Sequence, residues 1–110
     1  SNGIETFESI KFAKTRPDAR IPSKNLEDAG YDIYACLDRD FQVIMPQEMV
    51  LIPTGICSAF SEDFVMVLKE RGSTGTKCMA VRAGIIDSGF RGQWQVPINN
   101  TSDSVIIISK

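Results

Sequence analysis

The sequence predicts an all-β domain, a sandwich or barrel of short strands with at most one short helix. Short apolar runs rich in Ile, Val and Phe recur along the chain and are separated by turn residues, a pattern typical of closely spaced strands. No long segment keeps apolar residues at helical spacing. Four prolines lie at the ends of these runs or within them, where proline is typical of sheet edges and strand termini: Pro22, Pro46, Pro53 and Pro97.

Each apolar run is expected to form one strand, because β-branched and aromatic side chains pack well on a pleated, half-buried surface. The one expected helix follows Arg71 and covers residues 73–79. In chain order the expected strands are residues 10–13, 32–37, 41–45, 49–52, 56–60, 64–68, 94–98 and 105–108.

The chain of 110 residues fits a single domain over residues 3–110, since it contains no repeat, linker or low-complexity segment. Ser1 and Asn2, with no initiator Met, are interpreted as the remnant of a removed tag. A domain of this size buries a limited core, so oligomerisation would add stability. The continuous apolar run at residues 105–108 indicates either a covering subunit or a chain that continues past Lys110.

Composition excludes several classes of function. The net charge of −2 gives no electrostatic reason to expect nucleic acid or an anionic membrane as partner, and no apolar stretch approaches membrane-spanning length. The chain has no histidine, which excludes Ser-His-Asp catalysis and His-ligated zinc. The three cysteines are too widely spaced for a zinc knuckle or a redox pair, and they are expected to be buried, reduced thiols of a cytoplasmic protein: Cys36, Cys57 and Cys78.

Three segments carry candidate chemistry. In the first, residues 28–35, small residues lead into an expected strand that places Asp32 and Tyr34 on one face. Aspartate is disfavoured inside a strand, so Asp32 either caps a local turn or contacts a cation.

The second segment, residues 70–77, combines glycines and hydroxyls with Arg71 directly after an expected strand. Free N–H groups at the start of a helix bind anions, and a guanidinium adds a bidentate donor, so this segment is a candidate phosphate site. The alternative is a polar turn in which Ser73 is the helix N-cap.

The third segment, residues 84–92, holds three glycines around Asp87, Phe90 and Arg91. Glycine permits positive φ and close backbone approach, so a tight hairpin whose main chain touches a ligand is expected. The alternative is a β-turn with a solvated Asp at its corner. A phosphate nest with two carboxylates and no histidine suits Mg²⁺, and together the segments indicate hydrolysis of a nucleoside triphosphate.

The three segments, in this order and spacing, resemble motifs one, two and three of the trimeric dUTPases. The matching residues are 29–35, 71–75 and 84–92, and residues 51–56 resemble the strand pair that precedes motif two. The resemblance implies a distorted jelly-roll, or β-clip, fold and a homotrimer with active sites between subunits. It also implies that dUTP is cleaved to dUMP and pyrophosphate with Mg²⁺ on the triphosphate.

The resemblance assigns a role to each candidate residue. Asp87 would orient and deprotonate the attacking water and contact the deoxyribose 3′-hydroxyl, and Phe90 would pack against the sugar and exclude a 2′-hydroxyl. Asp32 would hold Mg²⁺ through water. The remaining residues would bind substrate, the first three through phosphate and the last three through uracil: Arg71, Gly72, Ser73, Val81, Ile85 and Ile86.

The chain departs from the family pattern at several positions. Gly72 stands where many members have Ser, Val81 where some have Asn, and Phe90 where Tyr is usual. Motifs four and five, the latter a Gly-rich tail that closes over the triphosphate, would follow Lys110 and are absent from the sequence.

Two alternative functions compete. A dCTP deaminase shares the fold and a similar third motif, but its proton-shuttling Glu aligns with Pro97, which transfers no proton. The second alternative is a non-catalytic module of the same fold that binds nucleotide and regulates a partner. Retention of Asp32, Arg71 and Asp87 argues against a complete loss of catalysis.

Overall fold

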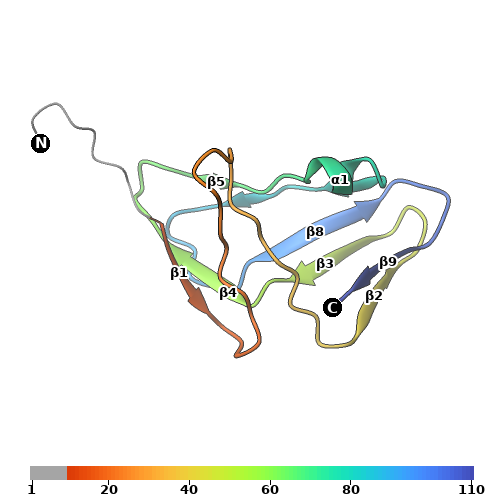
Figure 1. Cartoon of the computed structure of the whole chain (residues 1–110), viewed down its shortest axis with the longest axis horizontal. Coiled ribbons are helices and arrows are strands. Elements are labelled where there is room, and N and C mark those ends of the chain that lie inside the picture. Colours follow the sequence, from red (N-terminus) through yellow and green to blue (C-terminus); the bar gives the residue numbers. More distant parts are fainter. Residues whose placement is uncertain (1–9) are drawn as a thin grey trace, which may run out of the picture.

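A computed structural model describes residues 10–110, and within them the chain forms nine short strands and a single helical turn (Figure 1). The proposed tag remnant at residues 1–2 lies outside the described residues. In chain order the elements are β1 (Lys11–Lys14), β2 (Phe41–Ile44), β3 (Met49–Pro53), β4 (Ile56–Ala59), β5 (Met66–Val67), α1 (Gly72–Gly75), β6 (Met79–Val81), β7 (Ile85–Ile86), β8 (Gln95–Asn100) and β9 (Ile106–Ser109).

The strands assemble into small antiparallel sheets. Strand β8 is central in a three-stranded sheet of order β3-β8-β6, and the other sheets are pairs: β1 with β4, β2 with β9, and β5 with β7. Figure 1 shows β1 and β4 at one end of the molecule, β2 and β9 at the other, and β8 and β3 running between them. The predicted all-β class is confirmed.

Two apolar clusters form the core. One lies around the buried Trp94 and contains Ile56, Leu68 and Ile86, while the other joins Ile44 of β2 to Ile52 and Ile98. The half-buried Val81 and Val96 pack against both clusters. The indole Nε1 of Trp94 donates to Ser58 Oγ at 3.0 Å, so the polar atom of this buried ring is satisfied.

Residues 32–37 do not form the predicted strand. Asp32 makes only an isolated bridge to Ser23, whose carbonyl accepts the Asp32 N–H at 2.8 Å. Beyond it the segment is held by separate contacts rather than a ladder, including Arg20 stacked 3.9 Å over the Tyr34 ring. The predicted strand at 64–68 shortens to β5, and neither β6 nor β7 was among the predicted strands.

The helix is shorter than predicted and begins earlier. It covers Gly72–Gly75 instead of residues 73–79. Its glycines and hydroxyl residues have weak helix propensity, and Cys78 adopts a positive φ of 63° that no α-helix continues through. Cys78 is also exposed and Cys57 half-buried, so of the three cysteines predicted to be buried only Cys36 is.

Residues 84–92 do not close on themselves as the predicted hairpin. Strand β7 pairs with β5, with Ile85 opposite Val67, and the chain then turns back through residues 87–90. The Phe90 N–H donates to the Asp87 carbonyl at 3.1 Å, which is the bond of a β-turn. The alternative of a β-turn with an exposed Asp at its corner is therefore confirmed.

No helix in the described part of the chain has the length and apolar character needed to cross a membrane.

Candidate active site

A cavity of about 780 Å³ opens between the first two motif segments. One wall is the loop of residues 28–33, the opposite wall is residues 66–71, and Phe12 and Trp94 line it as well. Phe12 packs edge-on against both Tyr31 and Trp94, with ring centroids 5.6 Å apart in each pair. The cavity is of the size that small-molecule sites usually have, and an aromatic cluster forms part of its lining.

Arg71 and Asp32 meet across this cavity. The Arg71 Nε lies 3.7 Å from Asp32 Oδ1, and both side chains remain well exposed. A smaller adjoining cavity of about 190 Å³ is lined by the same two residues together with Thr74 and Val81. The structure thus brings together Arg71, Asp32 and Val81, which were predicted to contact phosphate, Mg²⁺ and uracil respectively.

The two predicted phosphate ligands after Arg71 lie in α1. Arg71 occupies the N-cap position in an extended conformation, and no side chain in the described part of the chain caps the helix. The interpretation of Ser73 as N-cap is therefore wrong, because Ser73 lies inside the helical turn. The Gly72 Cα faces open space, with no atom within 4 Å of where a Cβ would stand.

Glu70 is a residue that the sequence analysis did not single out. Its Oε2 accepts the Val81 N–H at 2.8 Å, and its side chain is 27% exposed. This hydrogen bond, followed by one from its own N–H, lowers the pKa of Glu70 below its ordinary 4.5, against the opposing effect of burial. Glu70 directly precedes Arg71 in the sequence, but no local pattern indicates that its side chain meets the main chain of Val81.

Asp87 and Phe90 line none of the three cavities described here, which lie within residues 10–110. Both are exposed. The Phe90 ring lies against Gly92, where a Cβ would come within 2.8 Å of Phe90 Cζ. Ile85 is also exposed, whereas Ile86 is buried in the core opposite Met66. The third motif segment therefore presents its carboxylate and ring to the outside of this chain.

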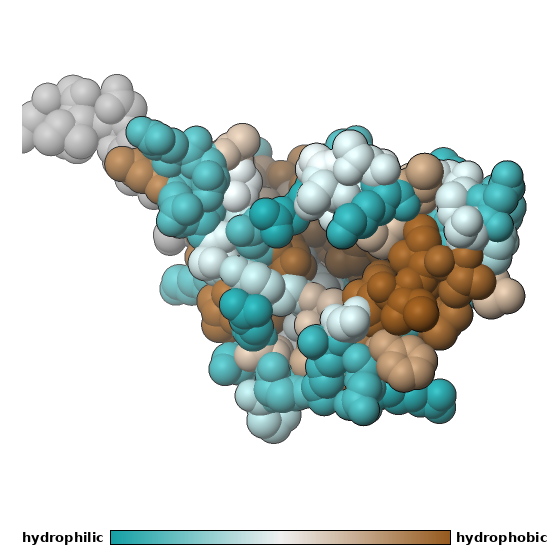
Figure 2. Space-filling view, turned by 45° about the vertical axis from the view of Figure 1, so that its right-hand side comes forward, coloured by the Kyte–Doolittle hydropathy of each residue, from teal (hydrophilic) through white to brown (hydrophobic). Residues whose placement is uncertain are grey.

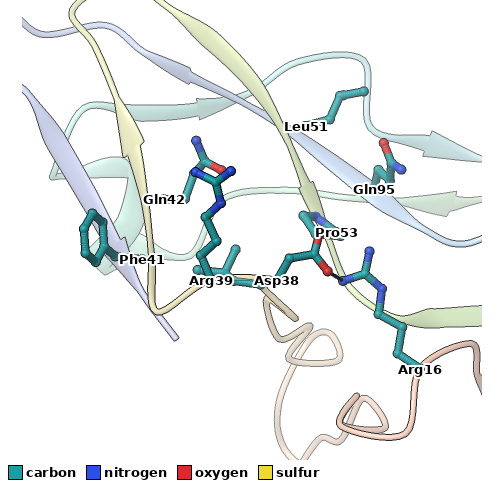
Figure 3. Close-up of a pocket in the computed structure, with 9 residues that line it drawn as sticks. Arg16, Asp38, Arg39, Phe41, Gln42, Leu51, Pro53 and Gln95 are labelled. Atoms are coloured by element: carbon teal, nitrogen blue, oxygen red, sulfur yellow. Dashed lines mark hydrogen bonds and ion pairs between the residues drawn. The ribbon is translucent and has the colours of Figure 1, made fainter.

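A separate cavity of about 280 Å³ lies between β2 and β3 and holds none of the predicted site residues. Figure 3 shows Arg16 joined to Asp38 at one side of it, and Arg39 beside Gln42 at the other. The Arg16–Asp38 ion pair is 2.6 Å long, and the same guanidinium donates to the Cys36 carbonyl at 3.1 Å. These contacts anchor the loop between residues 36 and 39 to the segment after β1.

The described residues contain no group of three or more His, Cys, Asp or Glu side chains placed to hold a metal ion. Asp32 faces the main cavity, and Asp28 lines the same wall. Magnesium is commonly bound by one or two carboxylates together with substrate phosphates and water. The donor set at this cavity therefore fits a metal that arrives with a phosphorylated ligand.

Comparison with known families identifies the chain. The family model of the dUTPases matches residues 18–110. The chain belongs to the dUTPase family. Among curated proteins it is 37% identical over 103 residues to the deoxyuridine 5′-triphosphate nucleotidohydrolase of Leptospira interrogans, covering 90% of this chain and 70% of that one. The corresponding protein of a Hydrogenobaculum strain is 35% identical, covering 88% of this chain and 69% of that one.

Solved dUTPase structures share the fold. A variant of the Staphylococcus bacteriophage 80α dUTPase superposes with a TM-score of 0.78 at 29% identity, covering 86% of this chain and 60% of that one. A mutant dUTPase of phage φ11, described with a structural Mg(II) ion, gives 0.76 at 29% identity, covering 86% and 61%. The chain thus spans less than two thirds of these phage dUTPases. The predicted jelly-roll-like fold of the dUTPase family is confirmed.

Proposed function

We propose that this chain hydrolyses dUTP to dUMP and pyrophosphate. The observation that carries the proposal is the meeting of Arg71 and Asp32, 3.7 Å apart, over a cavity of about 780 Å³ in a chain of the dUTPase family. A phage 80α dUTPase at 29% identity was solved with the nucleotide dUpNHpp, which supports a deoxyuridine nucleotide as the ligand class.

Phosphate binding is assigned to Arg71 and to the main chain of Gly72 and Ser73. A guanidinium presents two parallel donors to phosphate, and the first N–H groups of a helix have no partner within the helix, which in α1 includes those of Gly72 and Ser73. Asp32 would hold Mg²⁺ through water, and when bound that ion would supply charge neutralisation for the leaving pyrophosphate. If Arg71 moved away from Asp32 toward the phosphates, the Asp32 carboxylate would become available to hold the ion.

Asp87 is assigned the activation of water for attack on the α-phosphate. A carboxylate serves as general base when it lies within hydrogen-bond reach of the water, and the β-turn at residues 87–90 fixes the main chain that carries it. The Phe90 ring, held against Gly92, would form the wall that leaves no room for a 2′-hydroxyl. Main-chain groups of Val81, Ile85 and Ile86 are proposed to read uracil.

A homotrimer with active sites between subunits is part of the proposal, because Asp87 and Phe90 lie outside the cavity that Arg71 and Asp32 line. Exposed apolar side chains support assembly. Figure 2 shows apolar residues gathered over the end of the molecule formed by β2, β3 and β9, and the exposed large apolar residues on these strands are Phe41, Met49, Leu51 and Ile107.

A cytoplasmic location, where nucleotides are available and thiols stay reduced, is proposed as well.

The test is pyrophosphate release from dUTP with Mg²⁺, compared between the wild-type protein and Asp87→Asn. Release that requires Mg²⁺, prefers dUTP over UTP and dCTP, and falls by about 100-fold or more in the variant would support the proposal. Release of ammonia from dCTP would instead show a deaminase. A wild-type protein that binds dUTP and yields no pyrophosphate would favour a nucleotide-binding regulatory module.

A further inference from the structure

The Val81 N–H lies on the open edge of a sheet. Among the described residues 10–110, strand β6 pairs only with β8, since the order of that sheet is β3-β8-β6. On the paired side the Arg82 N–H donates to the Pro97 carbonyl at 2.9 Å. Because successive residues of a strand point their N–H groups to opposite sides, the Val81 N–H points away from β8. Its partner there is the Glu70 carboxylate, at 2.8 Å.

The sheet pairing of β6 ends at this residue. Pro97 has no N–H, so it accepts from Arg82 but returns no hydrogen bond to it. The chain then leaves the sheet through Ala83 and Gly84, which have φ of 52° and 81°. Within residues 10–110, the loop 81–84 is held on the β8 side through Arg82, whose guanidinium also donates to Asn99 Oδ1 of β8 at 2.9 Å. The position of its other residues depends on contacts from the opposite side.

The segment 68–70 supplies those contacts at both ends of the loop. The Leu68 N–H donates to the Gly84 carbonyl at 2.7 Å, and Glu70 holds Val81. The Leu68 carbonyl also approaches Gly84 so closely that a Cβ there would lie 2.8 Å away. The bond between Leu68 and Gly84 continues the main-chain pairing of β5 with β7. The bond at Val81, in contrast, depends on one side chain, that of Glu70.

We propose that Glu70 is a positioning residue for nucleobase recognition, fixing the loop 81–84 to the segment that carries Arg71. This inference rests on the proposed function, in which main-chain groups near this loop read uracil. Two adjacent residues then serve opposite ends of the nucleotide. Arg71 binds the phosphates, and Glu70 holds the loop that contacts the base. The Val81 N–H, occupied by Glu70, is not among the donors left for uracil.

The chemistry of the bond fits this role. A hydrogen bond from an N–H to an ionised carboxylate is stronger than one between neutral groups, and the Glu70 side chain is mostly shielded from solvent. Lys69 Nζ, 3.7 Å from Glu70 Oε1, faces the second oxygen. Loss of the carboxylate would leave Val81 unpaired at a sheet edge, free to move or to be solvated.

The experiment compares Glu70→Ala and Glu70→Gln with a matched control, Glu48→Ala. Glu48 Oε1 likewise accepts a main-chain N–H, from Met45 at 3.0 Å, but in a turn that lines none of the described cavities. Affinities for dUMP and dUTP are measured with the full-length protein, together with kcat. Hydrogen exchange at the Val81 amide reports the bond directly.

In Glu70→Ala we expect faster exchange at Val81 and an equal loss of affinity for dUMP and dUTP of about 10-fold, with kcat within about threefold. Glu70→Gln, which keeps an acceptor oxygen, should restore most of the affinity, and Glu48→Ala should leave it unchanged. A loss confined to dUTP would show that Glu70 acts through Arg71 and the phosphates, and would overturn the inference. Unchanged dUMP affinity or unchanged Val81 exchange would overturn it too.

The two proposals fail in different ways. A wild-type protein that releases no pyrophosphate but binds dUMP contradicts the proposed hydrolysis, while the affinity comparison still decides the role of Glu70. A wild-type protein that hydrolyses dUTP normally, and whose Glu70→Ala variant keeps its dUMP affinity, contradicts the positioning role alone.

Discussion

Arg71 and Asp32 neutralise one another across the main cavity, with the Arg71 Nε 3.7 Å from Asp32 Oδ1. The two side chains are 71% and 42% exposed, and solvent-exposed ion pairs contribute at most about 1 kcal/mol to folding. The pair therefore contributes little to the stability of the fold. Its consequence is that a cation and a carboxylate lie on opposite walls of one cavity.

Replacement of Arg71 by Ala should separate function from folding. We expect the melting temperature to stay within a few degrees of wild type, because the lost pair is exposed, while kcat/KM for dUTP falls by about 100-fold or more. Arg71→Lys keeps the charge but not the bidentate geometry, so its activity should be intermediate. Lys14→Ala, at the exposed end of β1 and outside the three described cavities, is the control and should keep wild-type activity. A large drop in the melting temperature of Arg71→Ala would contradict this reading of the pair.

The ring of Phe90 depends on the absence of a side chain at Gly92. A Cβ at Gly92 would stand 2.8 Å from Phe90 Cζ, closer than real contacts allow, whereas a Cβ at Gly89 meets nothing within 4 Å. Gly92→Ala should therefore displace the ring and reduce the preference for dUTP over UTP by about 10-fold, an effect on transition-state discrimination. Gly89→Ala is the matched control and should preserve the preference. Steady-state kinetics with dUTP and UTP measures the preference of each variant. Equal preferences in Gly92→Ala and Gly89→Ala would show that Phe90 does not contact the sugar.

Three of the candidate residues predicted from the sequence, Asp32, Arg71 and Val81, line one cavity, whereas the backbone around them differs from the prediction. Glycines and hydroxyls after Arg71 correctly indicated a short helix. The helix nevertheless ends at Gly75, and the positive φ of Cys78, through which the predicted helix would have to pass, is encoded by no local pattern. The segment 32–37 has the composition of a strand, but it meets a loop at Ser23 and only the last residue of β3, where the Cys36 N–H donates to the Pro53 carbonyl, so a single bridge forms. Strand pairing is non-local, and for that reason the pairing of β7 with β5 could not be read from residues 84–92.

Glu70 was missed for a similar reason. A glutamate at the end of a strand is usually solvated, and only the fold shows that the open edge of β6 lies beside it. At Pro97, in contrast, the sequence indicated a feature that the fold does not have. A proline inside an apolar run suggested a sheet edge, but Pro97 lies in β8, the central strand, where its missing N–H marks the end of β6.

Acid should destabilise the fold through Glu70 and Asp18. Hydrogen bonds from Val81 N–H and its own N–H lower the pKa of Glu70 from 4.5, and the Cys36 thiol lowers the pKa of Asp18 from 3.8. A carboxyl whose pKa is lower in the folded state binds its proton more weakly there than when unfolded. Its stabilising contribution is therefore fully present above the unfolded pKa and is lost as the pH falls through the folded pKa.

Urea unfolding from about pH 7 to about pH 3 measures this effect. The difference in unfolding free energy between wild type and Glu70→Gln should be largest near neutral pH and shrink below pH 4.5. The control is Glu62→Gln, because the exposed Glu62 side chain accepts no hydrogen bond within residues 10–110. Parallel curves for wild type and Glu70→Gln across the whole range would show that the Val81 bond does not respond to the charge of Glu70.

In the proposed homotrimer, the exposed apolar side chains of β2, β3 and β9 are expected to form contacts between subunits. Leu51 on β3 is 54% exposed beside other apolar residues, so Leu51→Lys would place a charge that cannot be buried in an apolar interface without a large desolvation cost. We expect this variant to sediment as a monomer at micromolar concentration, to keep its far-ultraviolet circular dichroism, and to lose nearly all pyrophosphate release.

The matched control is Leu26→Lys, because Leu26 is 96% exposed, more than any other large apolar residue within 10–110, and lies outside these strands. It should keep both the oligomeric state and the activity. Loss of activity together with loss of assembly is expected because Asp87 and Phe90 lie outside the cavity of Arg71 and Asp32, so one chain alone does not bring the two halves together. A Leu51→Lys protein that is monomeric and fully active would show that a single chain completes the site, and the proposed location between subunits would then be wrong.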